Sequence, residues 1–184
     1  MYLAGTVHER GFRKAGRSPA GGPALGWLAA VPDPEIPVVS VTDLGIVRDV
    51  SEAADGAVTV TVTPTYSGCP AMGTIRADIE SALRAAGFGE ITIETALSPA
   101  WTTDWITDAG RAKLRAAGYS TPGPAPRRAD GPVPLTLQPA PRRIACPACG
   151  STATRLDSEF SATPCKALYR CLDCREPFDH VKEI

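Results

Sequence analysis

Apolar and polar side chains alternate along residues 46–51 and 57–63, on either side of Asp55 and Gly56. A period of two is typical of half-buried strands, and an Asp-Gly pair between two such stretches favours a tight hairpin turn. Upstream, residues 23–31 form a short apolar stretch that predicts a helix. This helix must stop at PDPEIP, because each proline disfavours helical geometry in the residue before it.

After Pro70 the hydrophobic period changes to that of a helix of about four turns, and Gly87 suits its C-terminal cap. Its predicted apolar face consists of Met72, Ile75, Ile79, Leu83 and Ala86. Residues 90–97 alternate again, and a strand, helix, strand order implies a right-handed crossover with parallel pairing of the two strands. Residues 107–118 predict a last helix with a polar face. The predicted fold class is therefore α/β (α+β), a small mixed sheet with helices.

A proline-rich stretch separates this region from the rest of the chain. Residues 119–143 contain seven prolines and no apolar period, which predicts an extended linker between two domains that move independently. The expected organisation is a disordered tail at 1–22, the α/β domain at 23–118, the linker at 119–143 and a small domain at 144–184. The basic tail is also compatible with a transit peptide or with a start codon placed too early.

The net charge of −1 gives no general attraction to phosphate backbones or anionic membranes. Residues 23–118 carry six basic and twelve acidic side chains, a net charge of −6, and residues 142–184 carry seven and six. No apolar run approaches the roughly 18 residues of a membrane span. These observations argue against nucleic-acid and membrane partners and predict a cytoplasmic protein.

Four of the six cysteines form two C-x-x-C pairs, Cys146 with Cys149 and Cys171 with Cys174. Two such pairs supply the four thiolates that structural zinc prefers, which predicts a zinc-ribbon-like domain. A tail of this size needs the ion for much of its folding free energy. Iron held by the same four sulfurs is the alternative. Cys165 is left over, either as a small buried side chain or as an exchangeable fifth ligand, and His180 is expected at the surface.

Cys69 lies at the joint between a predicted strand and a predicted helix. With Pro70 at the first helical position, Cys69 becomes the N-cap, where free N–H groups and the helix dipole would lower its pKa. Asp33, Glu35 and Asp43 lie in loops that could gather at the same sheet edge and offer oxygen ligands to iron. Simple helix capping by Cys69, and loop or turn capping by Asp33 and Asp43, are the alternatives. Neither histidine belongs to this domain, which argues against a Cys-His catalytic dyad.

The stretches DPEIPVVSVTDLGIV and PTYSGCPAM resemble the SufT-like family of iron–sulfur assembly proteins. Together with CPACGS, SEFSATPCKALYRC and CREPFD, the chain after about residue 23 is similar to the PaaD family of accessory proteins of the phenylacetyl-CoA epoxidase system. The resemblance implies iron or cluster contact at Cys69, Asp33 and Glu35, and zinc-type ligands at Cys146, Cys149, Cys171 and Cys174. It also implies a client monooxygenase with a di-iron oxygenase component and a flavin and iron–sulfur reductase.

The expected function is that of a non-catalytic maturation factor with a structural zinc ion and transient iron or iron–sulfur contact. Expected partners are the oxygenase and reductase components and iron–sulfur carrier proteins, and apolar edge strands would also allow a homodimer. The rival hypotheses are a structural subunit of the oxygenase, an enzyme with Cys69 as nucleophile, and a nucleic-acid-binding zinc ribbon.

Overall fold

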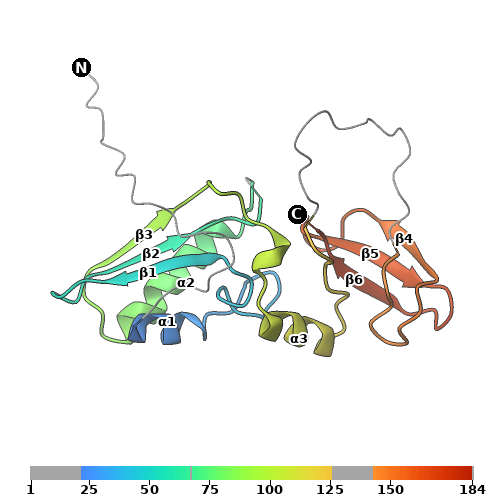
Figure 1. Ribbon diagram of the computed structural model, residues 1–184, viewed down its shortest axis with the longest axis horizontal. Coiled ribbons are helices and arrows are strands. Elements are labelled where there is room, and N and C mark those ends of the chain that lie inside the picture. The colour runs from blue at the N-terminus through green and yellow to red at the C-terminus, as the bar shows by residue number, and fades with distance from the viewer. Residues whose placement is uncertain (1–21, 67, 126–142, 184) are drawn as a thin grey trace, which may run out of the picture.

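The first part of the chain forms a three-stranded sheet (Figure 1). In this computed structural model, residues 22–66, 68–125 and 143–183 are described. Strand β1, Val47–Glu52, pairs antiparallel with β2, Val58–Val62, with Val50 opposite Val60, and a bulge interrupts the register between Val47 and Asp49. Strand β3, Ile91–Thr95, pairs parallel with β2. The predicted hairpin and crossover are confirmed.

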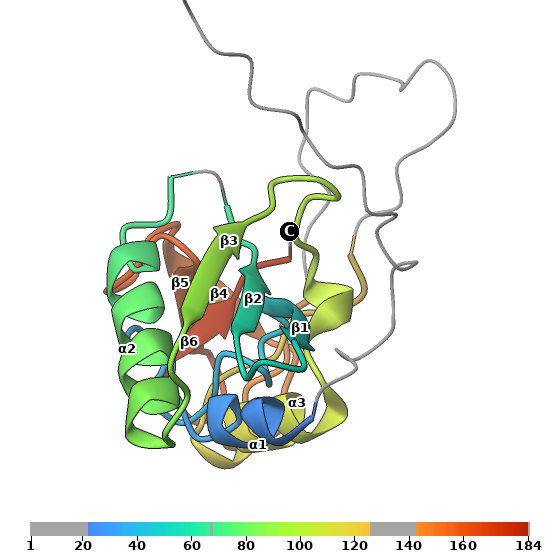
Figure 2. The ribbon, with the colours of Figure 1, turned by 90° about the vertical axis from the view of Figure 1, so that its left-hand side faces the viewer.

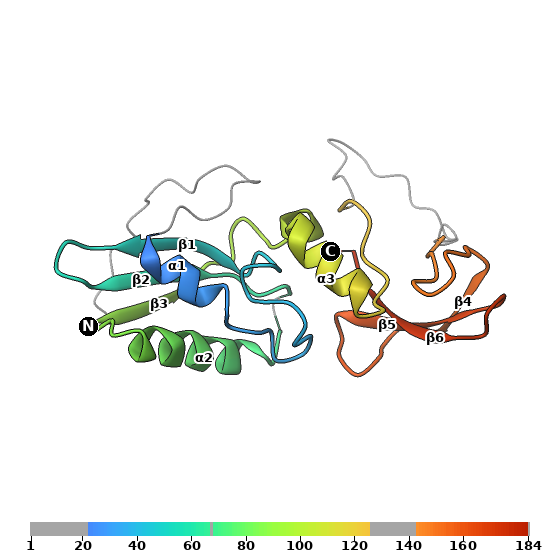
Figure 3. The same ribbon diagram turned by 90° about the horizontal axis from the view of Figure 1, so that it is seen from below.

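Two helices lie against one face of this sheet, as seen from below in Figure 3. Helix α1 spans Pro23–Leu28 and helix α2 spans Met72–Ala85. The chain leaves α2 through Gly87, whose φ is 92°, while the N–H of Phe88 donates to the carbonyl of Leu83. This is the glycine-terminated helix end that the sequence predicts.

Leu28, Ile79, Leu83 and Val60 are among the fully buried side chains between the helices and the sheet. Burial of each such side chain contributes about 1.5–3 kcal/mol, so this apolar core stabilises the domain. The buried residues recur with a period of two in the strands and 3.6 in the helices, as the apolar residues do in the sequence.

A short 3₁₀ helix η1, Thr103–Trp105, and helix α3, Asp108–Ala116, follow β3. Thr107 caps α3 by accepting the N–H of Gly110 at 3.0 Å. In Figure 1, α3 lies between the first sheet and the C-terminal strands.

The C-terminal part is a second three-stranded sheet, with order β4-β5-β6 and antiparallel pairing throughout. Its strands are β4, Thr154–Ser158, β5, Lys166–Cys171, and β6, Pro177–Val181. Seen from the end of the first sheet, these strands lie behind it (Figure 2). A smaller core includes Ile144, Tyr169 and Phe178. We call this part, residues 143–183, the ribbon.

The ribbon contacts the first domain directly. The N–H of Ser120 donates to the carbonyl of Asp179 at 2.9 Å, and the N–H of Val181 donates to the carbonyl of Ser120 at 3.0 Å. Val181 is itself part of the main core. These contacts favour a fixed arrangement of the two domains over the independent movement expected from the linker.

The first residues of the predicted linker, 119–125, lie in ordered contact with the folded parts: Gly123 N–H donates to Glu183 Oε1 at 3.1 Å. Residues 126–142 of that linker and residues 1–21 of the predicted tail at 1–22 are outside the described residues. Among the helices that are described, none is long and apolar enough to cross a membrane.

Candidate functional site

The sulfur atoms of Cys146, Cys149, Cys171 and Cys174 all lie within 4.8 Å of one another. Cys146 Sγ is 3.7 Å from Cys174 Sγ, and Cys149 Sγ is 3.6 Å from Cys171 Sγ. Disulfide sulfurs would be about 2 Å apart. Zinc–sulfur bonds of about 2.3 Å in a tetrahedron place the sulfurs about 3.8 Å apart, so these four thiols fit a zinc ion.

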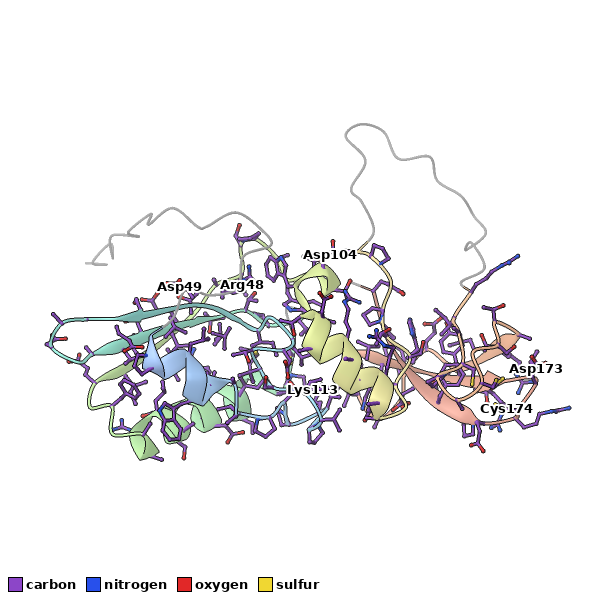
Figure 4. All side chains as sticks on the ribbon, turned by 60° about the horizontal axis from the view of Figure 1, so that its bottom comes forward. Arg48, Asp49, Asp104, Lys113, Asp173 and Cys174 are labelled. Atoms are coloured by element: carbon purple, nitrogen blue, oxygen red, sulfur yellow. The ribbon has the colours of Figure 1, made fainter. Side chains whose placement is uncertain are left out.

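Two tight turns bring these sulfurs together. In the first, the N–H of Gly150 donates to the carbonyl of Cys146 at 2.9 Å. In the second, Arg175 adopts a left-handed conformation with φ 69° directly after Cys174. Figure 4 shows Asp173 and Cys174 at the outer end of the ribbon, away from Lys113 of α3. Cys174 thus lies away from α3, whereas Cys146 of the same site lines a cavity together with Arg115 of α3 and Tyr119.

A second group of chemistry-bearing side chains lies where the two domains meet. Asp33, Glu35 and Cys69 of the first domain line a cavity of about 30 Å³ together with Cys165, Val181 and Lys182 of the ribbon. The cavity unites three of the four residues predicted to contact iron.

Asp33 and Glu35 are fixed by the turn that ends the segment after α1. Asp33 Oδ1 accepts the N–H groups of Glu35 and Ile36 at 2.9 and 2.8 Å, and Asp33 is only 5% exposed. Burial raises the pKa of Asp33, although both amide hydrogen bonds oppose the shift. The turn-capping role expected of Asp33 and its place in the cavity therefore coexist.

The structure corrects the prediction for Cys69. Helix α2 begins at Met72 with Ala71 as its N-cap, so Cys69 precedes the cap by two residues. Burial raises the pKa of the Cys69 thiol, and the charges of Glu35 and Asp33 add to this effect. Hydrogen bonds from the Ala71 N–H and the Thr65 hydroxyl oppose the shift without reversing it. The expected lowering of the pKa is wrong, because desolvation and two carboxylates outweigh the helix end.

Asp43 does not line this cavity. Its carboxylate accepts the N–H of Ser40 at 2.9 Å and the ammonium group of Lys113 at 2.6 Å. Although burial opposes the change, these hydrogen bonds hold the pKa of Asp43 below its usual value. The Asp43 carbonyl also accepts the N–H of Thr107 at 2.9 Å, so Asp43 anchors α3 to the loop before β1.

Cys165 is the residue whose role the sequence left open. Its thiol donates to Glu35 Oε2 at 3.5 Å, and its sulfur is 3.1 Å from Thr163 Oγ1. Burial raises the pKa of Cys165 to about 11. Strand β5 separates Cys165 from Cys171 by six residues, or about 20 Å, so Cys165 lies far from the four-cysteine site.

Two basic side chains of the ribbon are buried at this junction. Lys166 is 4% exposed, with its Nζ atom 3.4 Å from the carbonyl oxygen of Glu35 and 3.8 Å from Asp179 Oδ2. His180, expected at the surface, is 1% exposed with Nδ1 3.2 Å from Ser120 Oγ. The sequence contains one indication that a buried site lies near Lys166: the adjacent Cys165 belongs to neither C-x-x-C pair.

Two segments of the chain match models of known families. Residues 24–95 match the family described as iron–sulfur cluster assembly protein, and residues 130–182 match the PaaD zinc beta ribbon domain. The first segment contains Asp33, Glu35 and Cys69. The second contains Cys165 and the four clustered cysteines.

Known proteins similar to the chain include two curated proteins and several solved structures, one of them from Bacillus anthracis. It is 46% identical to a "Putative 1,2-phenylacetyl-CoA epoxidase" subunit of Escherichia coli over 157 residues, which are 85% of this chain and 89% of that protein. It is 38% identical to an "Fe-S protein maturation auxiliary factor" of Porphyromonas gingivalis over 88 residues, 47% of this chain and 83% of that protein. A domain of unknown function from Bacillus anthracis is 29% identical, with a TM-score of 0.47, and covers 50% of this chain and 87% of its own.

Proposed function

Because the chain belongs to the PaaD family, which includes the phenylacetyl-CoA epoxidase relative of Escherichia coli, we propose that it is a maturation factor for that monooxygenase. It would assist assembly or insertion of iron or iron–sulfur centres into the oxygenase of phenylacetate catabolism. The observation that carries this proposal is the cavity in which Cys69 faces Asp33 and Glu35, inside the segment that matches iron–sulfur cluster assembly proteins.

In this proposal the four-cysteine site holds zinc and the cavity handles iron as cargo. Zinc supplies folding free energy to the ribbon, whose own apolar core is small. Cys69 and the two carboxylates contact the iron, and the thiol gives up its proton when the metal binds. A metal held by few ligands in a small cavity between domains can be passed on, which suits transfer rather than storage.

The ribbon is the proposed docking surface for the client. Leu172, within the second C-x-x-C pair, is 45% exposed, and Phe160 is 64% exposed. We propose that the client protein covers these two side chains. The oxygenase and reductase components and iron–sulfur carrier proteins are the partners we propose.

We infer that the protein has no catalytic activity of its own. Within the described residues, no histidine lines the cavity, so Cys69 lacks the usual general base of a nucleophilic thiol. The rival hypothesis, a structural role within the oxygenase, requires co-purification with the oxygenase in a fixed ratio. A maturation factor leaves the finished enzyme.

The test is co-expression of the oxygenase with wild-type chain or with Cys69→Ser in cells that lack the native factor. Serine is close to cysteine in size, so folding and zinc content should stay unchanged while the iron content of the oxygenase falls several-fold. Thr74→Ser, in the exposed first turn of α2, is the matched control. Full iron loading with Cys69→Ser would overturn the role of Cys69.

A further inference from the structure

We propose that the cavity binds a single Fe²⁺ ion through the thiolates of Cys69 and Cys165 and the carboxylate of Glu35. The ribbon would then be part of the cargo site and not only a docking module. The choice of iron rests on the proposed function, whereas the ligand set rests on the residues that line the cavity.

The separation of two donors already matches that on a metal ion. Cys165 Sγ and Glu35 Oε2 are 3.5 Å apart. Metal–sulfur and metal–oxygen bonds of about 2.3 and 2.0 Å, at a tetrahedral angle, also place the two donor atoms about 3.5 Å apart. An ion can therefore replace the thiol proton between these atoms with little movement.

Cys69 supplies the third donor by moving toward this pair. Among the described residues, the four-cysteine site is the only group of at least three donors in which all lie within 4.8 Å of one another. Cys69 lines the same cavity, but its sulfur lies more than 4.8 Å from at least one of the other two donors. Its approach to the ion is therefore part of the proposal. In this arrangement Cys165 and Glu35 are already close together, and Cys69 approaches the ion. Such a site suits a metal ion that is bound and later released.

The number of donors favours one ion over a cluster. Two thiolates and one carboxylate are enough to hold one ion, whereas a two-iron, two-sulfide cluster is held by four protein ligands.

The charges at the junction are also consistent with a divalent ion. Binding releases the two thiol protons to water and leaves two thiolates and one carboxylate around Fe²⁺, with no change of oxidation state. The ammonium group of Lys166, 3.4 Å from the Glu35 carbonyl oxygen, offsets the remaining negative charge. Two sulfurs with one oxygen form a mixed donor set that suits late first-row divalent metals better than Mg²⁺ or Ca²⁺.

The test uses Co²⁺ as a spectroscopic probe for Fe²⁺, added without oxygen to the full chain with zinc already bound. The wild type should bind one Co²⁺ with thiolate-to-metal charge-transfer absorption. Cys69→Ser and Cys165→Ser should each lose about half of this absorption per bound ion, and the double variant should lose all of it. Glu35→Gln should weaken binding at least tenfold, while Glu94→Gln, an exposed carboxylate on β3, should match the wild type.

Zinc content and far-ultraviolet circular dichroism must be unchanged in each variant, and Cys165→Ala serves as a second variant at that position. A wild-type spectrum from Cys165→Ser and Cys165→Ala would overturn the proposal. So would a failure of Co²⁺ to bind the wild type, or stable uptake of two irons with two sulfides per chain. The oxygenase assay with Cys69→Ser tests the proposed function, whereas Co²⁺ binding tests the ligand set. Either proposal can therefore fail without the other.

Discussion

Replacing Gly45 by alanine should destabilise the first domain more than the same change at Gly56. Both residues have a positive φ, 68° at Gly45 and 87° at Gly56, which L-residues adopt at a cost of about 1–2 kcal/mol. Alanine also restricts the unfolded chain and returns about 0.4–1 kcal/mol. At Gly56 a new Cβ meets nothing within 4 Å, so the net loss should be about 1 kcal/mol or less.

At Gly45 the new Cβ would lie 2.6 Å from the carbonyl oxygen of Trp105 and 2.8 Å from the Trp105 Cβ atom. Backbone must shift, which adds about 1–3 kcal/mol as in other overpacked sites. The expected total loss of unfolding free energy is about 1–4 kcal/mol. The loop around Gly45 also holds Leu44, whose carbonyl accepts the indole N–H of Trp101 at 2.9 Å.

Urea unfolding followed by circular dichroism measures the difference. The unfolding free energy falls by about 2 kcal/mol per M urea. Gly45→Ala should therefore lower the urea midpoint by about 0.5–2 M, and Gly56→Ala by about 0.5 M or less. Equal shifts for the two variants would refute the reasoning, because only the contact with Trp105 distinguishes them. If a variant changed the dependence of the unfolding free energy on urea, its folded or unfolded state would differ from that of the wild type, and the midpoints could not be compared directly.

Three further predictions concern the cysteines and the linker. Cys171→Ser should abolish zinc binding and unfold the ribbon, as judged by metal analysis and proteolysis, while β1–β3 stay folded. Cleavage within 126–142 should leave two pieces that elute together in gel filtration, because Ser120 and Val181 hold the ribbon to the first domain. Alkylation of Cys69 and Cys165 in the zinc-loaded protein should be slower than that of an unstructured cysteine at pH 7. Each rate should rise about tenfold per pH unit up to pH 9, because both pKa values are raised and only the thiolate reacts.

Each of these has a clear contrary result. Zinc at full occupancy in Cys171→Ser would count against the four-cysteine assignment. Separate elution of the cleaved pieces would show that the contacts at Ser120 are too weak to hold the domains together. Fast alkylation of Cys69 at pH 7, with no dependence on pH, would indicate a thiolate and restore the idea of a helix-activated cysteine.

Local patterns were enough to predict most of the elements. The alternation around Asp55 and Gly56 encodes the hairpin, and the apolar face of residues 72–83 encodes α2, because each signal is contained in a few consecutive residues. The spacing of the two C-x-x-C pairs likewise predicted four sulfurs at one point, since a short turn fixes each pair.

What the sequence did not reveal depends on packing between distant residues. Glu35 and Cys165 are 130 residues apart, and their contact exists only because the ribbon lies against the first domain at Ser120. The raised pKa of Cys69 follows from burial and from two loop carboxylates rather than from the neighbouring helix. Asp43 and Asp33 both lie in loops, so the sequence predicted the same role for both. In the structure the Asp43 carboxylate binds Lys113 of α3 and does not line the cavity.

The cavity between the domains also sets an order of events during synthesis. A ribosome makes residues 33–69 well before residues 165–182, and N-terminal domains generally fold first. The cavity residues of the first domain are therefore exposed until the ribbon has been synthesised. In the proposed assignment the ribbon also needs its own metal ion to fold. If the four-cysteine site holds zinc as proposed, zinc is acquired before Cys69 and Cys165 line one cavity. A zinc-starved cell would then hold chains whose first domain is folded but whose proposed iron site lacks the residues of the ribbon.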